Sequence, residues 1–313
     1  MATTGRASGE PALLRSIAVA GASGFLGTAL AAHLQAEGVI VRRLRRGSRT
    51  VSPDITWDPA QGTIDSAALE GVDAIVNLAG EPIAQRWTGQ RKAAIRDSRI
   101  RATSLLANTI ARLREPPRTF LSGSATGIYG DRGDEELDER SALGVDFLAE
   151  TAIAWERSAQ AAASAGVRVA LLRTGIVLNP SGGALAKMLL PFKLGLGGRI
   201  GSGTQWMSWI GLSDWVRAAS FLLNVDTIEG PVNLVAPNAM PNVEFTKALA
   251  RVLGRPTLGF VPATAVDLFF GEMGRATLLA SQRVRPRRLV DAGFEFTHPT
   301  LERALRAELS APR

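Results

Sequence analysis

Residues 16–27 read SIAVAGASGFLG, and this stretch decides the fold that the chain can adopt. Its first five residues are small or apolar and have the length of a buried strand. Three glycines follow, Gly21, Gly24 and Gly27, and an amphipathic helix is expected from about Phe25 to Glu37. A strand, a glycine turn and a helix in this order are typical of the first βα unit of a parallel sheet.

The same alternation continues along the chain and predicts a doubly wound, Rossmann-like α/β sheet of about seven strands. Further strands are expected at Val39 to Leu44, Ile55 to Trp57, Ala74 to Leu78, Thr119 to Ser122 and Val167 to Arg173. Helices are expected at Arg91 to Arg114, Phe147 to Ala165, Ala184 to Leu194, Asp214 to Leu223, Ala248 to Gly259 and Thr264 to Met273. We therefore divide the chain into a flexible tail (1–15), a Rossmann domain (16–180) and a smaller lobe (181–313) that holds late Rossmann segments and C-terminal helices.

The composition excludes several classes of site. The chain has no cysteine and only two histidines, His33 and His298, so neither thiolate chemistry nor a metal site is expected. The net charge of +7 comes with no recognition-helix or zinc-finger pattern, which argues against a nucleic-acid partner. The apolar runs are too short to cross a bilayer and no signal-peptide core precedes them, so we expect a cytoplasmic protein without a membrane partner.

The glycine turn has the chemistry that a pyrophosphate requires. Gly21 permits a tight turn, Gly24 lets the backbone approach the phosphates, and Gly27 allows close packing of helix and strand. The first helical turn offers free N–H groups and a partial positive charge. The predicted dinucleotide contacts in this turn are Gly21, Ser23, Gly24, Phe25, Leu26 and Gly27. The alternative is an ordinary βα turn.

The end of the second strand indicates which dinucleotide binds. Enzymes that use NAD place an acidic residue there for the ribose 2′-hydroxyl. Residues 39–53 contain no acidic residue, and Arg45 and Arg46 lie where the strand should end. Their guanidinium groups suit a 2′-phosphate, which predicts NADP(H) as the cofactor, unless this is only a solvated basic edge.

A third element, Asn77-Leu78-Ala79-Gly80, follows the fourth strand. Its small residues let the backbone pass close to the adenine ribose and the phosphates. We therefore add Leu78, Ala79 and Gly80 to the predicted cofactor contacts. All three elements fall at the carboxyl ends of strands, where dinucleotides bind in such sheets.

These residues, together with SGSATGIYG at 122–130, resemble the extended form of the short-chain dehydrogenase/reductase superfamily. More narrowly, the chain resembles an atypical "epimerase family" group of NADP-binding proteins with a C-terminal extension. That likeness rests on NLAGEPI (77–83), GSG (201–203), SWI (208–210) and RRLVDAGF (287–294). The resemblance implies that Arg45, Arg46, Leu78, Ala79 and Arg99 contact NADP and that Val177 lies near the nicotinamide.

The usual catalytic pair of this superfamily is missing. It consists of a Tyr and a Lys four residues later on one helix face, where the ammonium lowers the pKa of the phenol. Tyr129 is the only tyrosine, and Gly133 stands four residues after it. If Trp155-Glu156 is aligned with the Glu that usually follows the pair, Leu148 and Ala152 occupy the two catalytic positions. The sequence therefore excludes the standard mechanism.

Three other residues are candidates for the chemistry. Ser124 can hydrogen-bond a substrate carbonyl, and Tyr129 or Glu81 can exchange a proton. Each has an alternative role: Ser124 as a turn former, Tyr129 in packing, and Glu81 as a carboxylate at a helix N-terminus.

Two hypotheses remain open. One is an NADP-dependent oxidoreductase or epimerase-like enzyme acting on a small carbonyl, hydroxyl or sugar-nucleotide substrate. The other is a non-catalytic NADP(H)-binding regulatory protein. Helices that flank the sheet often form homodimers in this superfamily, which makes a homodimer possible here by analogy only, since the sequence does not determine the oligomeric state.

Overall fold

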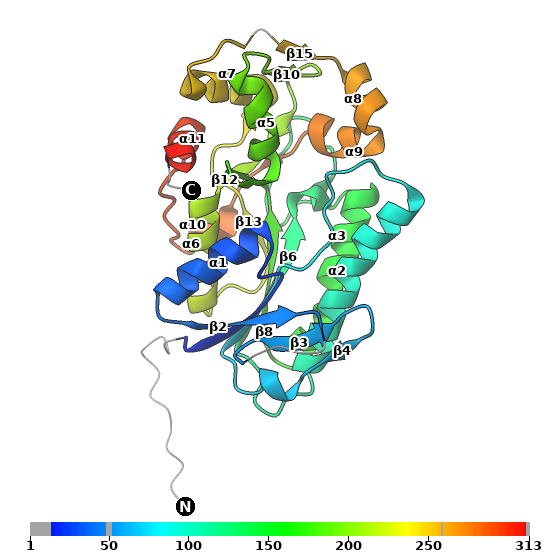
Figure 1. The fold of residues 1–313 in the computed structure, drawn as a ribbon, viewed down its shortest axis with the longest axis vertical. Helices are drawn as coiled ribbons and strands as arrows, with labels where there is room; N and C mark the ends of the chain where they lie inside the picture. Colours follow the sequence, from blue (N-terminus) through cyan, green and yellow to red (C-terminus); the bar gives the residue numbers. More distant parts are fainter. Residues whose placement is uncertain (1–13, 48–51, 258, 311–313) are drawn as a thin grey trace, which may run out of the picture.

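The computed structural model describes residues 14–47, 52–257 and 259–310 and has a central eight-stranded sheet (Figure 1). The strand order is β13-β8-β6-β5-β1-β2-β3-β4; all neighbours pair in parallel except β4, which is antiparallel to β3. The strands are β1 (Ser16–Ala20), β2 (Ile40–Arg45), β3 (Ile55–Asp58), β4 (Thr63–Ile64), β5 (Ala74–Asn77), β6 (Thr119–Ala125), β8 (Arg168–Thr174) and β13 (Gly230–Leu234). The predicted doubly wound fold class is confirmed.

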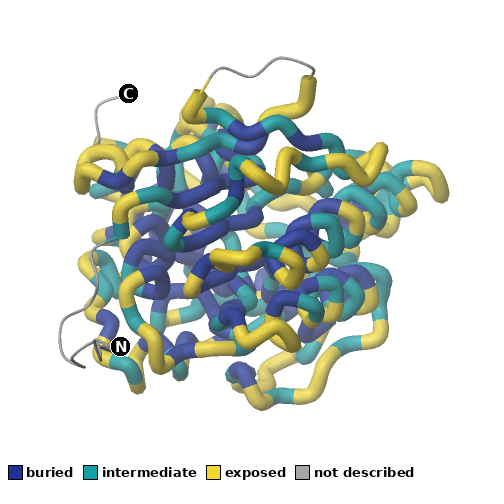
Figure 2. Tube along the Cα trace, turned by 90° about the horizontal axis from the view of Figure 1, so that it is seen from below, coloured by how far each residue is buried: buried dark blue, intermediate teal, exposed yellow. Residues whose placement is uncertain are grey.

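Helices cover both faces of this sheet, which is why its central strands read as continuous apolar runs. Helices α1 (Phe25–Ala36) and α6 (Leu212–Asn224) contribute to the hydrophobic cluster on one face. Helices α2 (Gly89–Ile110) and α4 (Gln160–Ser164) contribute to the cluster on the other, and α3 (Phe147–Arg157) packs beside α2. Figure 2 shows the buried segments gathered inside and the exposed ones on the periphery.

The predicted tail over residues 1–15 lies mostly outside the described residues. The first described residues are already tied to the sheet, because the N–H of Arg15 donates to Asp73 Oδ2 at 2.7 Å.

Three expected helices differ from the structure. The helix expected over Thr264 to Met273 ends at Phe270, because Gly271 has φ +58°, and the short helix Glu272–Gly274 follows. The helix expected over Phe147 to Ala165 is divided into α3 and α4, and at the break the Ser158 hydroxyl donates to the Ala154 carbonyl at 2.7 Å, a bond that bends helices. The helix expected over Ala248 to Gly259 is α7, which spans Asn242–Leu253 and ends where Gly254 and then Pro256 follow.

Strand β13 was not located from the sequence because it begins with Gly230-Pro231, a pair typical of turns. Proline is tolerated there because β13 is an edge strand.

The smaller lobe lies at the top of Figure 1 and is held by its own hydrophobic cluster. It contains α5 (Gly183–Lys193), α7, α8 (Ala263–Phe270), α9 (Glu272–Gly274), a π-helical turn (Arg275–Leu279) and α11 (Leu301–Ser310). Pairs of short strands lie outside the central sheet. They are β10 (Gly198–Ile200) with β15 (Gly259–Val261), β11 (Trp206–Met207) with β14 (Met240–Pro241), β9 (Ile176–Asn179) with β12 (Trp209–Gly211), and β7 (Glu136–Leu137) with β16 (Arg283–Val284). The remaining elements are α10 (Arg287–Asp291) and the 3₁₀ turns Ala67–Leu69 and Thr126–Tyr129.

Two buried carboxylates fasten the C-terminal segment to the sheet. Asp214, in the first turn of α6, accepts the backbone N–H groups of Thr297 and His298, both at 2.9 Å. Glu308 of α11 accepts the N–H of Ser213 at 2.9 Å and the amide of Asn179 at 2.7 Å. The C-terminal helix is thus anchored to the segments that follow β8.

Candidate functional site

The glycine turn is fixed by backbone packing. Gly21 has φ +78°, and a Cβ there would lie 2.7 Å from the carbonyl carbon of Leu78. A Cβ on Gly27 would lie 2.1 Å from the carbonyl oxygen of Gly21. Gly24 precedes α1 and provides no side-chain cap, so the first turn of the helix keeps donors for an anion. The geometry fits a pyrophosphate at this helix.

A segment far along the chain covers this turn. The ring of Phe25 occupies the space in front of Gly182, where a Cβ would meet the ring at 2.5 Å. Val177 is buried in the same hydrophobic cluster as Ala22, with Leu26 and Leu78 packed against it. Phe25, Leu26, Leu78 and Val177 therefore belong to or pack against one hydrophobic cluster, and their contact with a dinucleotide stays a prediction.

Asn77 shapes the segment after β5. Its buried amide donates to Thr103 Oγ1 at 2.8 Å, and its Oδ1 accepts the N–H of Ala79 at 3.2 Å. These bonds hold the chain in a tight bend, so that Leu78 and Ala79 pass close to Gly21.

Arg99 lies beneath this bend. Its Nη1 donates to the carbonyls of Glu81 at 3.0 Å and Ile95 at 2.9 Å, and its guanidinium lies 5.1 Å from the ring of Trp155. A Cβ on Gly80 would meet this guanidinium at 3.2 Å. Burial lowers the pKa of Arg99 to about 10. A partly desolvated cation beside the bend suits an anionic ligand.

The two arginines at the end of β2 are not equivalent. Arg45 Nε lies 2.5 Å from Asp54 Oδ2, and the other oxygen of Asp54 accepts the N–H of Arg43 at 3.3 Å. Arg46 is exposed and makes no ion pair with any residue that the structure describes. The sequence analysis missed Asp54 because only the pairing of β2 with β3 brings it beside Arg45. Arg46 is therefore the more available partner for a phosphate.

A buried chain of polar side chains begins at Ser124, at the carboxyl end of β6. Ser124 Oγ donates to Glu156 Oε1 at 2.6 Å, and Arg173 binds both oxygens of Glu156, at 2.8 and 2.9 Å. Arg173 Nη1 also donates to the hydroxyl of Tyr129 at 3.0 Å, and this hydroxyl donates to Asn233 Oδ1 at 2.7 Å. We call these five residues the Ser124–Asn233 chain.

The sequence analysis missed Glu156 and Arg173 as site residues. Arg173 stands in the strand sequence RVALLRT, where it is the one charged side chain toward the carboxyl end. A charge within a buried strand requires a partner, and this signal was available in the sequence. The sequence does not show the parallel register of β6 with β8, which sets Arg173 beside Ser124.

The environment of Tyr129 speaks against the predicted acid-base role. The ring is fully buried, because the 3₁₀ turn Thr126–Tyr129 directs it into a small core with Ile128 and Val284. Burial raises the pKa of Tyr129 to about 12. Both hydrogen bonds of its hydroxyl go to protein groups, so we assign it to packing.

Glu81 is half-buried in the segment after β5, and its carboxylate, with the side chain 42% exposed, lies 3.7 Å from Arg91 Nη1. The alternative that Glu81 stabilises a helix N-terminus is wrong, because α2 begins at Gly89 and is capped by Thr88, whose Oγ1 accepts the N–H of Arg91. Its carboxylate therefore remains accessible to solvent.

The comparisons with known proteins agree with this geometry. A family model described as the NAD dependent epimerase/dehydratase family matches residues 17–234. The chain belongs to this family. A second model, a domain of unknown function (DUF1731), matches residues 261–308, which confirms the resemblance to epimerase-family proteins with a C-terminal extension.

Two similar proteins and one solved structure match this chain over more than nine-tenths of their length. The chain is 44% identical over 290 residues to epimerase family protein Mb2239 of Mycobacterium bovis, covering 92% of this chain and 96% of that protein. It is 36% identical over 295 residues to human epimerase family protein SDR39U1, covering 93% and 98%. The crystal structure of human SDR39U1 (isoform 2) with NADPH aligns with a TM-score of 0.87 and 34% identity, over 95% of this chain and 100% of that chain.

Leu148 and Ala152, which the alignment of Trp155-Glu156 in the sequence analysis puts at the positions of the missing Tyr and Lys, have apolar side chains. A Cβ placed on Gly127 would contact Leu148 Cβ at 3.4 Å, and Ala152 is buried in the same small core as Tyr129. Helix α3 therefore packs on the turn after β6 without presenting an acid or a base at either position.

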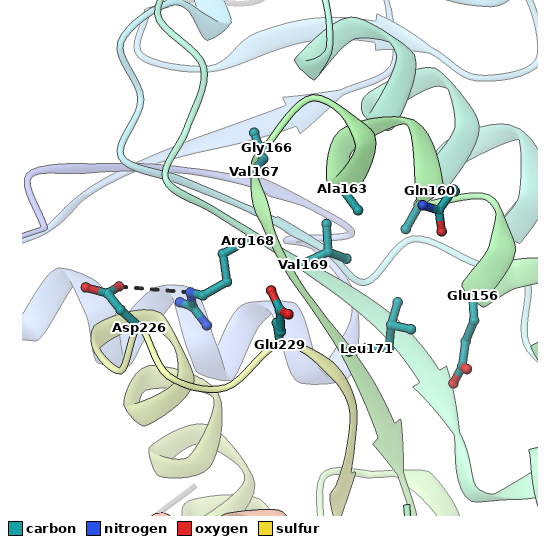
Figure 3. A pocket seen from close by; sticks show the side chains of 12 residues that line it. Glu156, Gln160, Ala163, Gly166, Val167, Arg168, Val169, Leu171, Asp226 and Glu229 are labelled. Atoms are coloured by element: carbon teal, nitrogen blue, oxygen red, sulfur yellow. Dashed lines mark ion pairs between the residues drawn. The ribbon is translucent and has the colours of Figure 1, made fainter. Parts of the chain in front are cut away.

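A groove of about 580 Å³ runs beside β8, between α4 and the edge strand β13 (Figure 3). It is lined by polar side chains that include Glu156, Gln160, Arg168, Asp226 and Glu229. Glu156 thus belongs both to this groove and to the Ser124–Asn233 chain. The groove gives solvent a route to the Glu156 carboxylate.

The structure also describes both histidines and the tryptophans of the chain. Among the residues that the structure describes, no group of three or more His, Cys, Asp or Glu side chains is arranged to hold a metal ion. Trp209 is fully buried and belongs to the core of the smaller lobe, while Trp206 is half-buried and donates to Asp134 Oδ1 at 2.9 Å.

Proposed function

We propose that this protein binds NADP(H) in the crevice at the carboxyl ends of the strands and uses it as an oxidoreductase or epimerase-like enzyme. The substrate class is a small carbonyl, hydroxyl or sugar-nucleotide compound. The observation that carries the proposal is the bond from the Ser124 hydroxyl to a buried, arginine-paired Glu156.

The cofactor part rests on four features of the crevice. The first turn of α1 offers N–H groups to the pyrophosphate, and the bend after Asn77 lets the backbone pass close. Arg99 supplies a desolvated cation, and Arg46 supplies an exposed one for the 2′-phosphate. NADPH in the crystal structure of human SDR39U1 supports the same choice of cofactor.

The bound nicotinamide would supply or accept a hydride. Ser124 donates its own proton to Glu156, so its oxygen lone pairs are left to accept a hydrogen bond from a substrate hydroxyl. When the substrate hydroxyl is oxidised, its proton passes to Ser124 Oγ while the Ser124 proton passes to Glu156 Oε1. Glu156 then releases the proton to water in the groove, and reduction of a carbonyl reverses these transfers.

Arg173 is a positioning residue in this scheme. Its two hydrogen bonds hold both oxygens of Glu156, which fixes the oxygen that faces Ser124. The side chains of Arg173 and Glu156 are only 5% and 11% exposed, so little water competes for these bonds.

The test measures NADPH oxidation against a panel of aldehydes, ketones and 4-keto sugar nucleotides. Ser124→Ala is expected to lower kcat by about 100-fold while leaving the Kd for NADPH unchanged. Ser122→Ala is the matched control, because Ser122 is buried on the same strand and its hydroxyl has no partner among the described residues. Equal loss of kcat in both variants would contradict the role of Ser124.

The regulatory hypothesis has one observation in its favour, namely Leu148 and Ala152 at the positions of the catalytic pair. It predicts tight NADPH binding with no turnover on any panel member. Transfer of deuteride from 4-deuterated NADPH to a single product rejects it, whereas bound NADPH that never transfers deuteride rejects the enzyme hypothesis.

A further inference from the structure

Large apolar side chains are exposed at one end of the molecule. Of the twelve exposed large hydrophobic side chains among the described residues, eight belong to α5, β15, α8 and the loop after α5. Figure 1 places these elements together at the top, in the smaller lobe. We call this set the apolar cap: Leu190, Leu194, Leu196, Phe260, Val261, Leu268, Phe269 and Phe270. Such clustering marks a surface that meets an apolar partner.

The side chains of the cap are largely exposed. Leu190 is 67% exposed, Leu196 69% and Phe269 68%. In α8 only Val266 is buried. The pairing of β10 with β15 and the position of the Arg199 guanidinium, 4.6 Å from the Phe260 ring, connect the parts of the cap.

The surroundings of the cap are basic. Lys187, Lys193, Arg199 and Arg255 are exposed around it. Residues 157–213 and 245–266 contain no acidic residue. Two acidic side chains that follow the second of these stretches are already paired: Asp267 with Arg275 at 2.7 Å and Glu272 with Lys92 at 2.7 Å.

We infer that the apolar cap docks on the surface of an anionic lipid bilayer. Leucine and phenylalanine side chains would enter the acyl boundary while the surrounding lysines and arginines meet the lipid phosphates. A symmetric contact with a second copy would place these cations against each other, which disfavours self-association through the cap. The inference concerns surface contact, since within the described ranges no helix is long and apolar enough to cross a membrane.

This proposal replaces the expectation that the protein has no membrane partner. That expectation came from the lengths of apolar runs, which test spanning only. The cap is assembled from two stretches, residues 190–196 and 260–270, whose proximity is a product of the fold.

Docking would also bring the bilayer close to the crevice. Lys187 Nζ donates to the carbonyl of Ala84 at 3.4 Å, and Arg86 Nη1 donates to the carbonyl of Leu268 at 3.5 Å. The segment after β5 is therefore held between α5 and α8, the two helices that carry the cap.

The test is co-sedimentation of the full chain with vesicles. We expect binding to phosphatidylcholine vesicles that contain about one quarter phosphatidylglycerol, and at least fivefold weaker binding to phosphatidylcholine alone. Because the attraction is partly electrostatic, about 0.5 M salt should also weaken binding.

Two pairs of variants separate the contributions. Leu194→Asp with Phe269→Asp should reduce vesicle binding at least tenfold, whereas Val145→Asp should not, because Val145 is 88% exposed outside the cap. Lys193→Glu should weaken binding about fivefold, whereas Arg101→Glu on α2 should have little effect. Circular dichroism and NADPH titration of each variant establish that the fold is retained.

Two outcomes overturn the proposal. If the chain ignores anionic vesicles and light scattering shows a dimer that Leu194→Asp with Phe269→Asp dissociates, the cap is a self-interface. If the chain is monomeric and ignores the vesicles, the cap has no lipid-docking role. Neither result depends on enzymatic turnover, so these experiments do not test the proposed enzymatic function, which is tested separately.

Discussion

The cofactor crevice and the Ser124–Asn233 chain lie at the same edge of the sheet but are built differently. The crevice depends on backbone approach: Gly21 against Leu78, Gly27 against Gly21, and a bend fixed by Asn77. The chain depends on buried side chains that satisfy one another's charge and hydrogen bonds. The crevice is therefore sensitive to added side-chain volume, and the Ser124–Asn233 chain is sensitive to removal of a charged or hydrogen-bonding partner. Each can be disrupted without the other.

The largest expected effect comes from removing one partner of the buried pair. Arg173→Ala leaves Glu156 as an uncompensated buried carboxylate and should lower the free energy of unfolding by about 3–5 kcal/mol, measured by urea denaturation. The double variant Arg173→Met with Glu156→Met removes both charges and should recover most of this loss. Equal destabilisation in both variants would show that the loss comes from packing.

Added volume in the crevice should have the next largest effect. Gly27→Ala places a Cβ 2.1 Å from the Gly21 carbonyl oxygen and should destabilise the protein by about 3 kcal/mol and weaken NADPH binding. In Gly24→Ala the nearest protein atom lies at 3.2 Å, so a much smaller loss of stability is expected, while NADPH binding should still weaken because Gly24 is a predicted phosphate contact. Thermal unfolding and NADPH fluorescence titration measure both, and a harmless Gly27→Ala would refute the packing argument.

Removing the exposed phosphate partner should weaken binding without affecting the fold. Arg46→Ala should raise the Kd for NADPH by about tenfold or more and leave the Kd for NADH unchanged, because only NADPH carries the 2′-phosphate. Arg45→Ala should have the smaller effect, since Arg45 is already paired with Asp54. If Arg45→Ala raises the Kd for NADPH more than Arg46→Ala does, Arg45 leaves Asp54 and binds the phosphate when NADPH is present.

The smallest expected effect concerns pH and Glu139. Burial raises the pKa of Glu139, whose Oε1 accepts the N–H groups of Asn233 and Arg288. The folded state therefore holds this proton to higher pH than the unfolded state, so its contribution to stability is lost as pH rises through the raised pKa. Glu139→Gln should keep both hydrogen bonds and remove this decrease of stability with rising pH. It should therefore stabilise the protein at neutral pH by up to about 1 kcal/mol. Urea denaturation at several pH values measures the free energy of unfolding as a function of pH. If Glu139→Gln leaves this pH dependence unchanged, Glu139 is not its source.

The parts of the site that consist of a few consecutive residues could be predicted from the sequence. The glycine turn, the Asn77–Gly80 bend and the arginines after β2 each occupy a few consecutive residues, and their chemistry follows from residue type and position along a strand. The pairing of Arg45 with Asp54 and the burial of Tyr129 were not predictable, because both depend on what lies on the neighbouring strand or turn.

By itself, the sequence determined the fold class, the crevice at the carboxyl ends of the strands and the absence of a Tyr-Lys pair, because strand length, glycine spacing and residue identity are local properties. Only the tertiary structure decided that Glu156 and Arg173 meet Ser124, that Tyr129 points into the core, and that two separate stretches form one apolar cap. Those contacts join residues far apart in the chain, and the register of β6 with β8 and the pairing of β10 with β15 bring them together.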